Sequence, residues 1–344
     1  MNIYDISQKA GVSIATVSRV LNGKAHVSEK TRNKVLSVIE QTQYVPNPFA
    51  RGLGLNTMKT IGLACPDASD PYLGTAIEVL EREFHRHEYE CILVCTGRER
   101  DNRIAGISEL VSRHVDGVVL IGSSFIEETE KKNQYIRDAA KNAPVFLLNG
   151  SYTAENVYSV FCDDLQATKD AVCFLHENGR RRILYLYHTR NDHGFINFSG
   201  RQKKMGYLAG LEKCGLPMDP ELIRVVPYQE MDVLSVQNML MNLHDQGLVF
   251  DAVMTSEDIL AVGAVKFARK CSIQVPDELS IIGYNNSQLC LCCDPELSSV
   301  DNQLKAIGEC IVESMINVLA GKEAPRSMVF NGKLIQRSST GLTT

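Results

Sequence analysis

Hydrophobic positions at the start of the chain recur at helical spacing in three short segments. The segments span about residues 3–10, 14–21 and 29–43, and each follows a residue of a type that caps helices. The capping residues are Asn2, Ser13 and Ser28, and the positions expected to face the interior are Ile3, Ile6, Ala10, Val17, Val20, Leu21, Val35, Leu36 and Ile39. Two helices joined by a tight turn that contains Gly11, followed by a third helix, predict an all-α helix-turn-helix head.

From residue 60 onward, short β-rich runs alternate with stretches of amphipathic helical spacing. The expected strands are 61–65, 91–95, 117–121, 145–148, 183–187, 223–226, 252–255 and 280–283. The expected helices are 73–87, 101–114, 130–142, 165–178, 201–214, 232–246, 258–270 and 303–319. This alternation predicts an α/β core with doubly wound parallel sheets. Because the core is long for one such sheet, we expect two lobes.

Composition fits an ordinary globular protein of 344 residues with a net charge of −5. No window approaches the run of about 18 apolar residues that a membrane span needs, and the N-terminus lacks the pattern of a secretory signal. The eleven cysteines are scattered and odd in number, which is typical of reduced thiols in a cytoplasmic protein. We therefore expect a cytoplasmic location and no membrane partner.

The charge is divided unevenly along the chain. Residues 1–60 hold eight basic and three acidic side chains, so they carry +5, and the remaining residues carry −10. A basic head on an acidic body is the electrostatic pattern of a nucleic-acid-binding module attached to another domain. A basic surface that is merely solvated would give the same charge, so charge alone leaves both interpretations open.

The second predicted helix has an outward face suited to DNA. With Val17 and Val20 buried, it turns outward Ile14, Ala15, Ser18 and Arg19. A helix fits the major groove, which is about 12 Å wide, and Arg can make a bidentate contact to guanine. Ser13 and Thr16 at the helix start suit phosphate oxygens. The alternative is a three-helix bundle for protein contacts, in which Arg19 would be solvated.

Three ordered runs in the first 51 residues carry a family resemblance. They read YDISQKAGVSIATVSRVLNG (4–23), VSEKTR (27–32) and YVPNPFAR (44–51). Together with further matches through the body, they resemble the lactose/galactose repressor (LacI/GalR) family. The resemblance implies a helix-turn-helix domain over 1–45, a hinge helix and linker over 46–59, and a periplasmic-binding-protein-like effector-binding and dimerisation core over 60–344.

The resemblance also implies roles for individual residues of the head and hinge. Ile14, Ala15 and Arg19 fall on the positions that read operator bases in the family. Further DNA contacts, mostly to the backbone, are implied for Ser13, Thr16, Asn22, His26, Ser28, Thr31 and Asn47. Leu53 falls where the family places a wedge that unstacks a central base step. The hinge helix, from Pro48 to about Leu53, is expected to fold when DNA and a second copy hold it.

The same fold implies three crossings between the lobes, near 162, 290 and 323. Lobe 1 would comprise about 60–162 and 291–323, and lobe 2 about 163–290 and 324–340. Open parallel sheets bind ligands beyond the carboxyl ends of their strands, here in the cleft between the lobes. Each polar residue just after a strand is by itself more often a helix cap or a loop residue, but these converge on one crevice. The candidates are Asp67, Asp70, Tyr72, Ser123, Ser124, Asp163, Glu257, Asp258, Asn285 and Asn286.

Some effector positions depart from the family pattern. Lys203 stands where the family often has Arg, Glu257 precedes Asp258 where Asn-Asp is usual, and Asn285 follows Tyr284 where Asp is usual. Lys cannot make the two parallel hydrogen bonds of an Arg guanidinium, although Arg201 could partly replace the missing guanidinium. Because these groups commonly bind sugar hydroxyls, the departures count against a plain neutral sugar. The effector is expected to be a sugar, a sugar derivative or a related metabolite.

Enzyme motifs are missing from the sequence. It has no phosphate-binding loop, nucleophile elbow or His-Glu-x-x-His run. The cysteine cluster at 290–293 has no second Cys-x2-Cys pair and no nearby histidine that would complete a zinc site. No catalytic residue, metal or cofactor is therefore expected. A cytosolic α/β sugar or nucleoside hydrolase is the alternative, but it leaves residues 1–53 without a role. We predict a homodimeric DNA-binding repressor of a pseudopalindromic operator, controlled by a small molecule, with pairing into tetramers left open.

Overall fold

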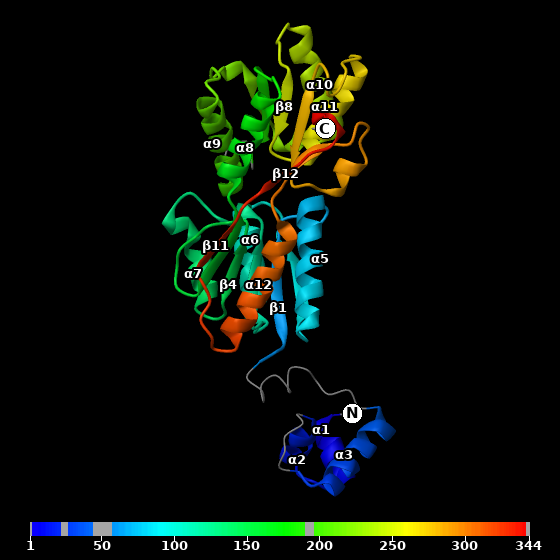
Figure 1. The fold of residues 1–344 in the computed structure, drawn as a ribbon. Helices are drawn as coiled ribbons and strands as arrows, with labels where there is room; N and C mark the ends of the chain where they lie inside the picture. The colour runs from blue at the N-terminus through cyan, green and yellow to red at the C-terminus, as the bar shows by residue number, and fades with distance from the viewer. Residues whose placement is uncertain (1, 22–26, 44–56, 190–195, 342–344) are drawn as a thin grey trace.

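The computed structural model describes residues 2–21, 27–43, 57–189 and 196–341 (Figure 1). The head contains the three expected helices, α1 (Ile3–Ala10), α2 (Ile14–Leu21) and α3 (Glu29–Thr42). Asn2 and Asp5 form a reciprocal capping box at the start of α1, and Gly11 ends the helix with a φ of 60°. The side chains of Ser13 and Ser28 cap the other two helices. Local capping thus defines the head as predicted.

The core of the head is small and agrees with the predicted apolar faces at most positions. Its buried residues are Ile6, Ala10, Val17, Val20 and Val35. Leu36, which we expected to face inward, is 46% exposed. Consecutive helix residues point about 100° apart, so with Val35 fully buried its neighbour is turned toward solvent.

The body contains two six-stranded sheets. The sheet of the first lobe runs in the spatial order β11 (Ser327–Phe330), β5 (Val157–Cys162), β4 (Val145–Leu148), β3 (Gly117–Ile121), β1 (Thr60–Cys65) and β2 (Glu90–Cys95). The sheet of the second lobe runs β12 (Lys333–Ile335), β10 (Ser298–Asp301), β9 (Ser280–Tyr284), β8 (Ala252–Thr255), β6 (Ile183–His188) and β7 (Ile223–Val226). Within these sheets every pairing is parallel except that of β10 with β12.

Helices cover both faces of each sheet, which confirms the doubly wound prediction. The helices of the first lobe are α5 (Pro71–Arg86), α6 (Arg100–Ser112), α7 (Gln134–Ala140) and α12 (Leu304–Leu319). The helices of the second lobe are α8 (Asp164–Glu177), α9 (Phe198–Lys213), α10 (Val233–Asp245) and α11 (Asp258–Lys270). Two separate hydrophobic clusters fill each lobe, one on either face of its sheet. In the first lobe α5 and α12 cover one face while α6 and α7 cover the other.

The chain passes between the lobes three times, and two of the crossings differ from expectation. The first lies between β5 and α8, near the expected residue 162. The second follows Asp301 rather than residue 290, because β10 pairs with β9 in the second lobe. The third lies between Phe330 and Lys333 rather than near 323, because β11 pairs with β5. Strands β10, β11 and β12 were not expected, since these short runs lack a continuous apolar pattern.

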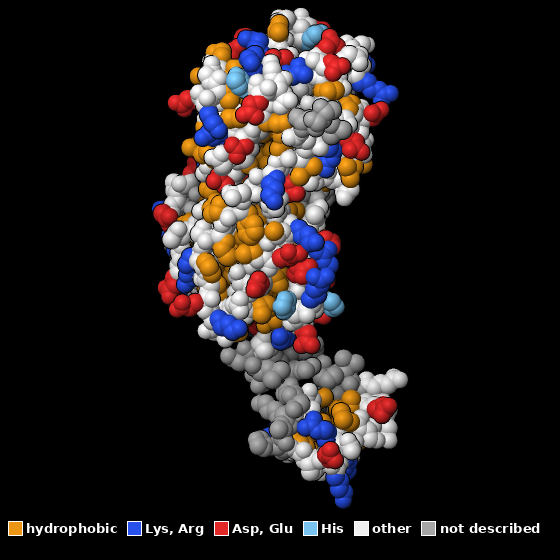
Figure 2. All heavy atoms as spheres, in the orientation of Figure 1, with side chains coloured by type: hydrophobic (Ala, Val, Ile, Leu, Met, Phe, Trp, Pro, Cys, Tyr) orange, Lys and Arg blue, Asp and Glu red, His pale blue; other side chains and the backbone are white. Residues whose placement is uncertain are grey.

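The surface of the body carries intermixed charges. Figure 2 shows Lys and Arg side chains interspersed with Asp and Glu over both lobes, with hydrophobic side chains gathered in the region where α12 and β11 lie in Figure 1. Val329 on β11, an edge strand, is 54% exposed. Within the part of the chain that the structure describes, no helix combines the length and apolarity that crossing a bilayer requires.

Close packing of α8 against α9 generates a stability prediction. A Cβ atom added at Gly206 would lie 2.3 Å from the Leu165 carbonyl oxygen and 2.8 Å from Thr168 Cβ. We expect Gly206→Ala to lower the free energy of unfolding by about 1–3 kcal/mol, because backbone must shift to admit the methyl group. Urea unfolding measures the change. Met205→Ala, at an exposed position of the same helix, is the control and should stay within about 0.5 kcal/mol of the original protein.

Candidate functional site

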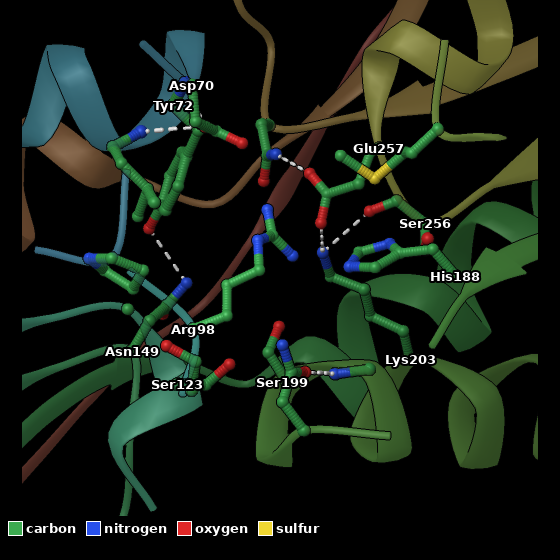
Figure 3. Close-up of a pocket in the computed structure, with 18 residues that line it drawn as sticks. Asp70, Tyr72, Arg98, Ser123, Asn149, His188, Ser199, Lys203, Ser256 and Glu257 are labelled. Carbon is green, nitrogen blue, oxygen red and sulfur yellow. Dashed lines mark hydrogen bonds and ion pairs between the residues drawn. The ribbon is translucent and has the colours of Figure 1, made fainter. Parts of the chain in front are cut away.

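A cavity of about 110 Å³ lies between the two lobes, at the carboxyl ends of the strands (Figure 3). Its wall is mostly polar side chains supplied by both lobes. The first lobe contributes Asp70, Tyr72, Arg98, Ser123, Ser124 and Asn149, and the second lobe His188, Ser199, Lys203, Ser256, Glu257 and Asn285. A ligand bound here would contact both lobes at once.

On the first-lobe side, the cavity wall is held by the cap of α5 and by a hydrogen bond between a tyrosine hydroxyl and an asparagine side chain. Asp70 caps α5, and its Oδ1 accepts hydrogen bonds from the backbone nitrogens of Tyr72 (2.9 Å) and Leu73 (3.0 Å). The Tyr72 hydroxyl accepts a hydrogen bond of 2.8 Å from Asn149 Nδ2. Asn149 Oδ1 in turn accepts from the backbone nitrogen of Cys162 at 3.3 Å, which ties the end of β4 to the end of β5. Tyr72 is therefore held by the sheet.

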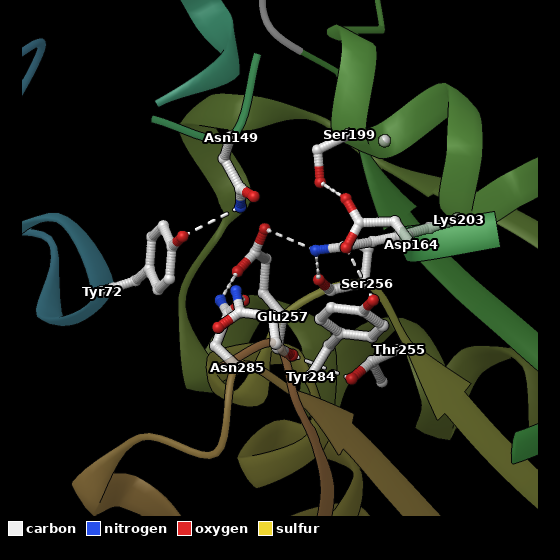
Figure 4. A network of polar contacts seen from close by, with 12 residues as sticks. Tyr72, Asn149, Asp164, Ser199, Lys203, Thr255, Ser256, Glu257, Tyr284 and Asn285 are labelled. Carbon is white, nitrogen blue, oxygen red and sulfur yellow. Dashed lines mark hydrogen bonds and ion pairs between the residues drawn. The ribbon is translucent and has the colours of Figure 1, made fainter. Parts of the chain in front are cut away.

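On the second-lobe side, a buried ammonium group organises the wall (Figure 4). Lys203 is 3% exposed, and its Nζ donates a 2.8 Å hydrogen bond to the carbonyl oxygen of Ser256. The same Nζ lies 3.6 Å from Glu257 Oε1 and 3.8 Å from the centroid of the Tyr284 ring. Glu257 Oε2 accepts a hydrogen bond from the Asn285 amide. The positive charge thus has a carboxylate, a carbonyl and an aromatic face as partners.

Burial changes the ionisation of Glu257. Loss of water around the carboxyl raises its pKa to about 7, and the nearby Lys203 charge opposes part of this rise. Asp70 and Asp258 add to the rise by repulsion. The side chain keeps 24% of its surface exposed. The cavity therefore contains a carboxyl group that titrates near neutral pH.

A second acidic group lies behind the cavity wall. Asp164, at the start of α8, is 2% exposed and accepts a hydrogen bond of 2.7 Å from the Tyr284 hydroxyl. Its other carboxylate oxygen accepts from the Ser199 hydroxyl. Burial raises the pKa of Asp164, while the nearby Lys203 charge lowers it. This network links the first crossing to α9 and β9.

Most effector candidates from the sequence lie at this cavity. The structure brings together Asp70, Tyr72, Ser123, Lys203, Glu257 and Asn285. Asp163 does not line the cavity, because it caps α8 through a 3.0 Å hydrogen bond from Gln166 N. Arg201 points elsewhere and donates to the Ile196 carbonyl oxygen at 2.8 Å.

Asp258 does not line the main cavity; its carboxylate instead holds a neighbouring loop. It is 2% exposed and accepts hydrogen bonds from the Ser299 hydroxyl (2.6 Å) and the Ser287 nitrogen (2.7 Å). These bonds hold the loop that follows β9, beside a smaller recess that Asp258 also lines. The position of Asp258 after β8 therefore predicted a location near the cavity, but its side chain faces the loop that follows β9.

Several cavity residues were missed from the sequence. Asn149 and Ser256 directly follow β4 and β8, so the rule that found Asp70 and Glu257 could have found them too. His188 ends β6, and burial lowers its pKa to about 4, with the Lys203 and Arg98 charges adding to the effect. Burial also lowers the pKa of Arg98 to about 10, which leaves it charged at neutral pH.

The outward face of α2 is a candidate DNA interface. Ser13, Ile14, Ala15 and Arg19 are exposed, and Thr16 and Ser18 are half-buried. Ser28 at the start of α3 is exposed too, and Thr31 is half-buried. Four of the residues implied for DNA contact lie outside the described residues, namely Asn22, His26, Asn47 and Leu53.

Comparisons with known proteins cover the head and the body. Residues 2–47 match the model of bacterial regulatory proteins, lacI family, and residues 172–340 match that of the periplasmic binding protein-like domain. An HTH-type transcriptional regulator of Lachnoclostridium phytofermentans is 46% identical over 99% of this chain and 99% of its own length. Catabolite control protein A of Streptococcus mutans is 28% identical over 99% and 98% of the two chains.

Solved structures share the fold of the whole chain. A lac repressor dimer bound to operator and the anti-inducer ONPF superposes with a TM-score of 0.85, at 21% identity, over 99% of each chain. The complex of the transcriptional regulator CelR with cellobiose has a TM-score of 0.69, at 23% identity, over 98% of this chain and 99% of its own. The head and the two-lobed body therefore have the same fold as these structures.

The raised pKa of Glu257 predicts a pH-dependent stability. The ordinary pKa of a glutamate is about 4.5, and that of Glu257 in the folded protein is about 7. Between these two pH values the Glu257 carboxyl holds a proton in the folded protein that it has lost in the unfolded chain. Stability therefore falls as pH rises through this window, by at most about 1.4 kcal/mol per pH unit from this group. Glu257→Gln should remove that fall, as measured by urea unfolding between pH 4.5 and 8.

The control for this measurement is Glu309→Gln, an exposed carboxylate of α12 outside the cavity. The difference in stability between Glu257→Gln and Glu309→Gln should grow in favour of Glu257→Gln as the pH rises to 7. Parallel pH profiles for the two variants would contradict a carboxyl titrating near neutral pH in the cavity.

Proposed function

Because the chain belongs to the lacI family of bacterial regulatory proteins, we propose that it is a homodimeric repressor controlled by a small polyhydroxylated effector. As a member of this family it is a DNA-binding transcriptional regulator, and its relatives give no support to a hydrolase. The proposed repressor acts in the cytoplasm, where its operator DNA is found. The observation that carries the effector proposal is the cavity whose polar wall comes from both lobes.

In the proposed complex, α2 enters the major groove with its exposed face toward the bases. Arg19 makes a bidentate contact to guanine through its guanidinium group, while Ile14 and Ala15 offer apolar contacts, for example to a thymine methyl. Phosphate contacts come from the hydroxyls of Ser13, Thr16, Ser18, Ser28 and Thr31 and from the free N–H groups at the helix starts. Two heads related by a dimer axis then read a pseudopalindromic operator.

Asp116 supports a mechanical connection between the linker and the first lobe. Its carboxylate accepts hydrogen bonds from Thr57 Oγ1 (2.9 Å), Met58 N (2.9 Å) and Thr60 N (3.1 Å). The C-terminal end of the linker is thereby fixed to the loop before β3, beside the start of β1. A change in the angle between the two lobes would therefore move the linker together with the first lobe. The linker would pass this movement to the proposed hinge helix with Leu53.

Effector control can be tested once an operator is selected from random DNA with the full-length protein. We expect the selected sites to contain inverted half-sites. Sugars, sugar derivatives and nucleosides are then screened by thermal shift, since a ligand that binds the folded state raises the melting temperature. Each binder should also change operator affinity in a fluorescence anisotropy titration.

Removal of one cavity hydroxyl provides the matched variant. Tyr72→Phe should weaken such a binder by about 2- to 10-fold, the usual value of one neutral hydrogen bond. Tyr89→Phe, at the opposite end of the first-lobe sheet, should bind like the original protein. A ligand whose binding is unaffected by Tyr72→Phe but lost in a variant outside the cavity would place the effector elsewhere.

The reading role of Arg19 is tested by Arg19→Ala. Loss of a bidentate contact to guanine should weaken specific operator binding by about 1–3 kcal/mol and relax the preference at one base position per half-site. Anisotropy titrations over a range of salt concentrations measure the effect, with single-base operator variants to locate the relaxed position. Lys266→Ala on α11 is the control for charge removal outside the head. Equal operator affinity for Arg19→Ala and Lys266→Ala would contradict the proposed reading surface.

A further inference from the structure

Helices α8 and α9 lie side by side in the second lobe and approach each other closely through glycines of α9 (Figure 1). A Cβ atom added at Gly206 would lie 2.3 Å from the carbonyl oxygen of Leu165. One added at Gly210 would lie 3.2 Å from the carbonyl oxygen of Lys169. The close contacts therefore advance by four residues, about one helical turn, along each helix.

The next turn of each helix brings two cysteines together. Cys173 follows Lys169 by four residues on α8, and Cys214 follows Gly210 by four residues on the side of α9. The Sγ atom of Cys214 lies 3.4 Å from the Sγ atom of Cys173, so the two thiols are in direct contact. Neither residue lines the cavity between the lobes, because the pair lies near the carboxyl ends of the two helices.

The position of the pair is compatible with a disulfide bond. An S–S bond is about 2.05 Å long, so the two sulfur atoms have to approach by only about 1.4 Å from their present separation. The glycine contact one turn earlier holds the two helices close together at this point. Cys214 is the C-cap of α9, so a small movement there disturbs only the last turn of the helix.

An oxidant can reach one of the two thiols. Cys214 is half-buried, whereas Cys173 is only 8% exposed. Burial and the contact with Cys173 raise the pKa of Cys214 to about 11. Because the thiolate is the form that attacks an oxidant, the reaction is slow at neutral pH and needs sustained exposure. Once Cys214 is oxidised, the thiol of Cys173 is already beside it.

We propose that Cys173 and Cys214 are an oxidative modification site, at which a hydroperoxide such as hydrogen peroxide produces a reversible disulfide between α8 and α9. The Cys214 sulfur first attacks a peroxide oxygen, the O–O bond breaks, and the products are a sulfenic acid and water. The Cys173 sulfur then attacks the Cys214 sulfur, the S–O bond breaks, and the hydroxyl leaves with the thiol proton as a second water. Two thiols are thus oxidised to one disulfide, and hydrogen peroxide is reduced to two waters.

The disulfide fastens a helix that carries part of the cavity wall. Ser199 and Lys203 belong to the amino-terminal half of α9, and Ser199 already donates a hydrogen bond to Asp164 at the start of α8. The disulfide joins the same two helices near their carboxyl ends, so they are then linked at both ends. Because the bond also restricts the unfolded chain, the oxidised second lobe is more stable. A dithiol reduces the bond and restores both thiols.

The test uses the full-length protein after reduction and removal of the reductant. One portion is exposed to hydrogen peroxide, free thiols are blocked with N-ethylmaleimide, and linked peptides are identified by mass spectrometry. Cys214→Ser and Cys173→Ala remove the site from either side. Cys271→Ser is the matched control, because Cys271 is likewise half-buried and is the C-cap of α11. Melting temperature is measured before oxidation, after oxidation and after treatment with dithiothreitol.

We expect peptides linked through Cys173 and Cys214 in the oxidised original protein and in Cys271→Ser. Oxidation should raise the melting temperature of both by about 3–10 °C, as expected for a disulfide that closes a long loop, and dithiothreitol should reverse the rise. Peroxide should not raise the melting temperature of Cys214→Ser or Cys173→Ala. This difference separates the effect of the disulfide from oxidation of other thiols, of which Cys95 and Cys292 are exposed.

Three results would overturn the inference. One is that Cys214 remains a free thiol after prolonged exposure to peroxide. Another is that Cys214 ends as a sulfinic acid or in a disulfide with a different cysteine, including one of a second copy, which electrophoresis without reductant detects. The third is that the expected bond forms but the melting temperature stays unchanged or falls. None of these results bears on repression controlled by an effector, which the inference does not require.

Discussion

The buried ammonium group of Lys203 is the constraint on which the second-lobe wall of the cavity depends. A charge removed from water costs several kcal/mol unless partners surround it, and here the partners come from separate elements. Ser256 and Glu257 follow β8, Tyr284 ends β9, and Lys203 itself projects from α9. Tyr284 also connects Lys203 to the first crossing, because its hydroxyl donates a hydrogen bond to Asp164, which lies next to that crossing. Removing any one partner would leave a buried charge under-compensated, so these elements have to keep their relative positions.

The first lobe is organised around backbone contacts rather than around a charge. Asn149 ties the ends of β4 and β5 together and donates to Tyr72, while Asp70 fixes the start of the helix that carries Tyr72. At the opposite end of the same sheet, Asp116 binds the C-terminal end of the linker and the first residue of β1. The sheet therefore joins the cavity wall to the linker through a rigid hydrogen-bonded layer. In the function proposed above, a displacement of the first lobe would reach the linker through this layer.

Sequence patterns predicted the elements with strong apolar periodicity and missed those without it. Strands such as β3 and β4 are continuous apolar runs and were found, whereas β10, with the sequence Ser-Ser-Val-Asp, is buried only because β9 and β12 flank it. That omission moved the expected second crossing. Residues of the cavity wall were identified where polar residues directly follow strands, but the choice between neighbouring residues depends on side-chain direction. Asp163 was chosen although Asp164 faces the cavity network, and Arg98 was missed because the turn at Gly97 redirects the chain after β2.

In the proposed function, the division of the cavity between the lobes decides which ligands can act as effectors. A ligand shifts a conformational equilibrium only by the difference between its affinities for the two states. A small molecule that touched only the Lys203 side of the cavity would bind both lobe arrangements equally and would leave operator affinity unchanged. Arg98, Tyr72 and Asn149 approach from the first lobe, so a ligand that also engages them prefers the arrangement in which both walls are within reach. Effector binding and control of DNA binding would then depend on the same set of contacts from both lobes.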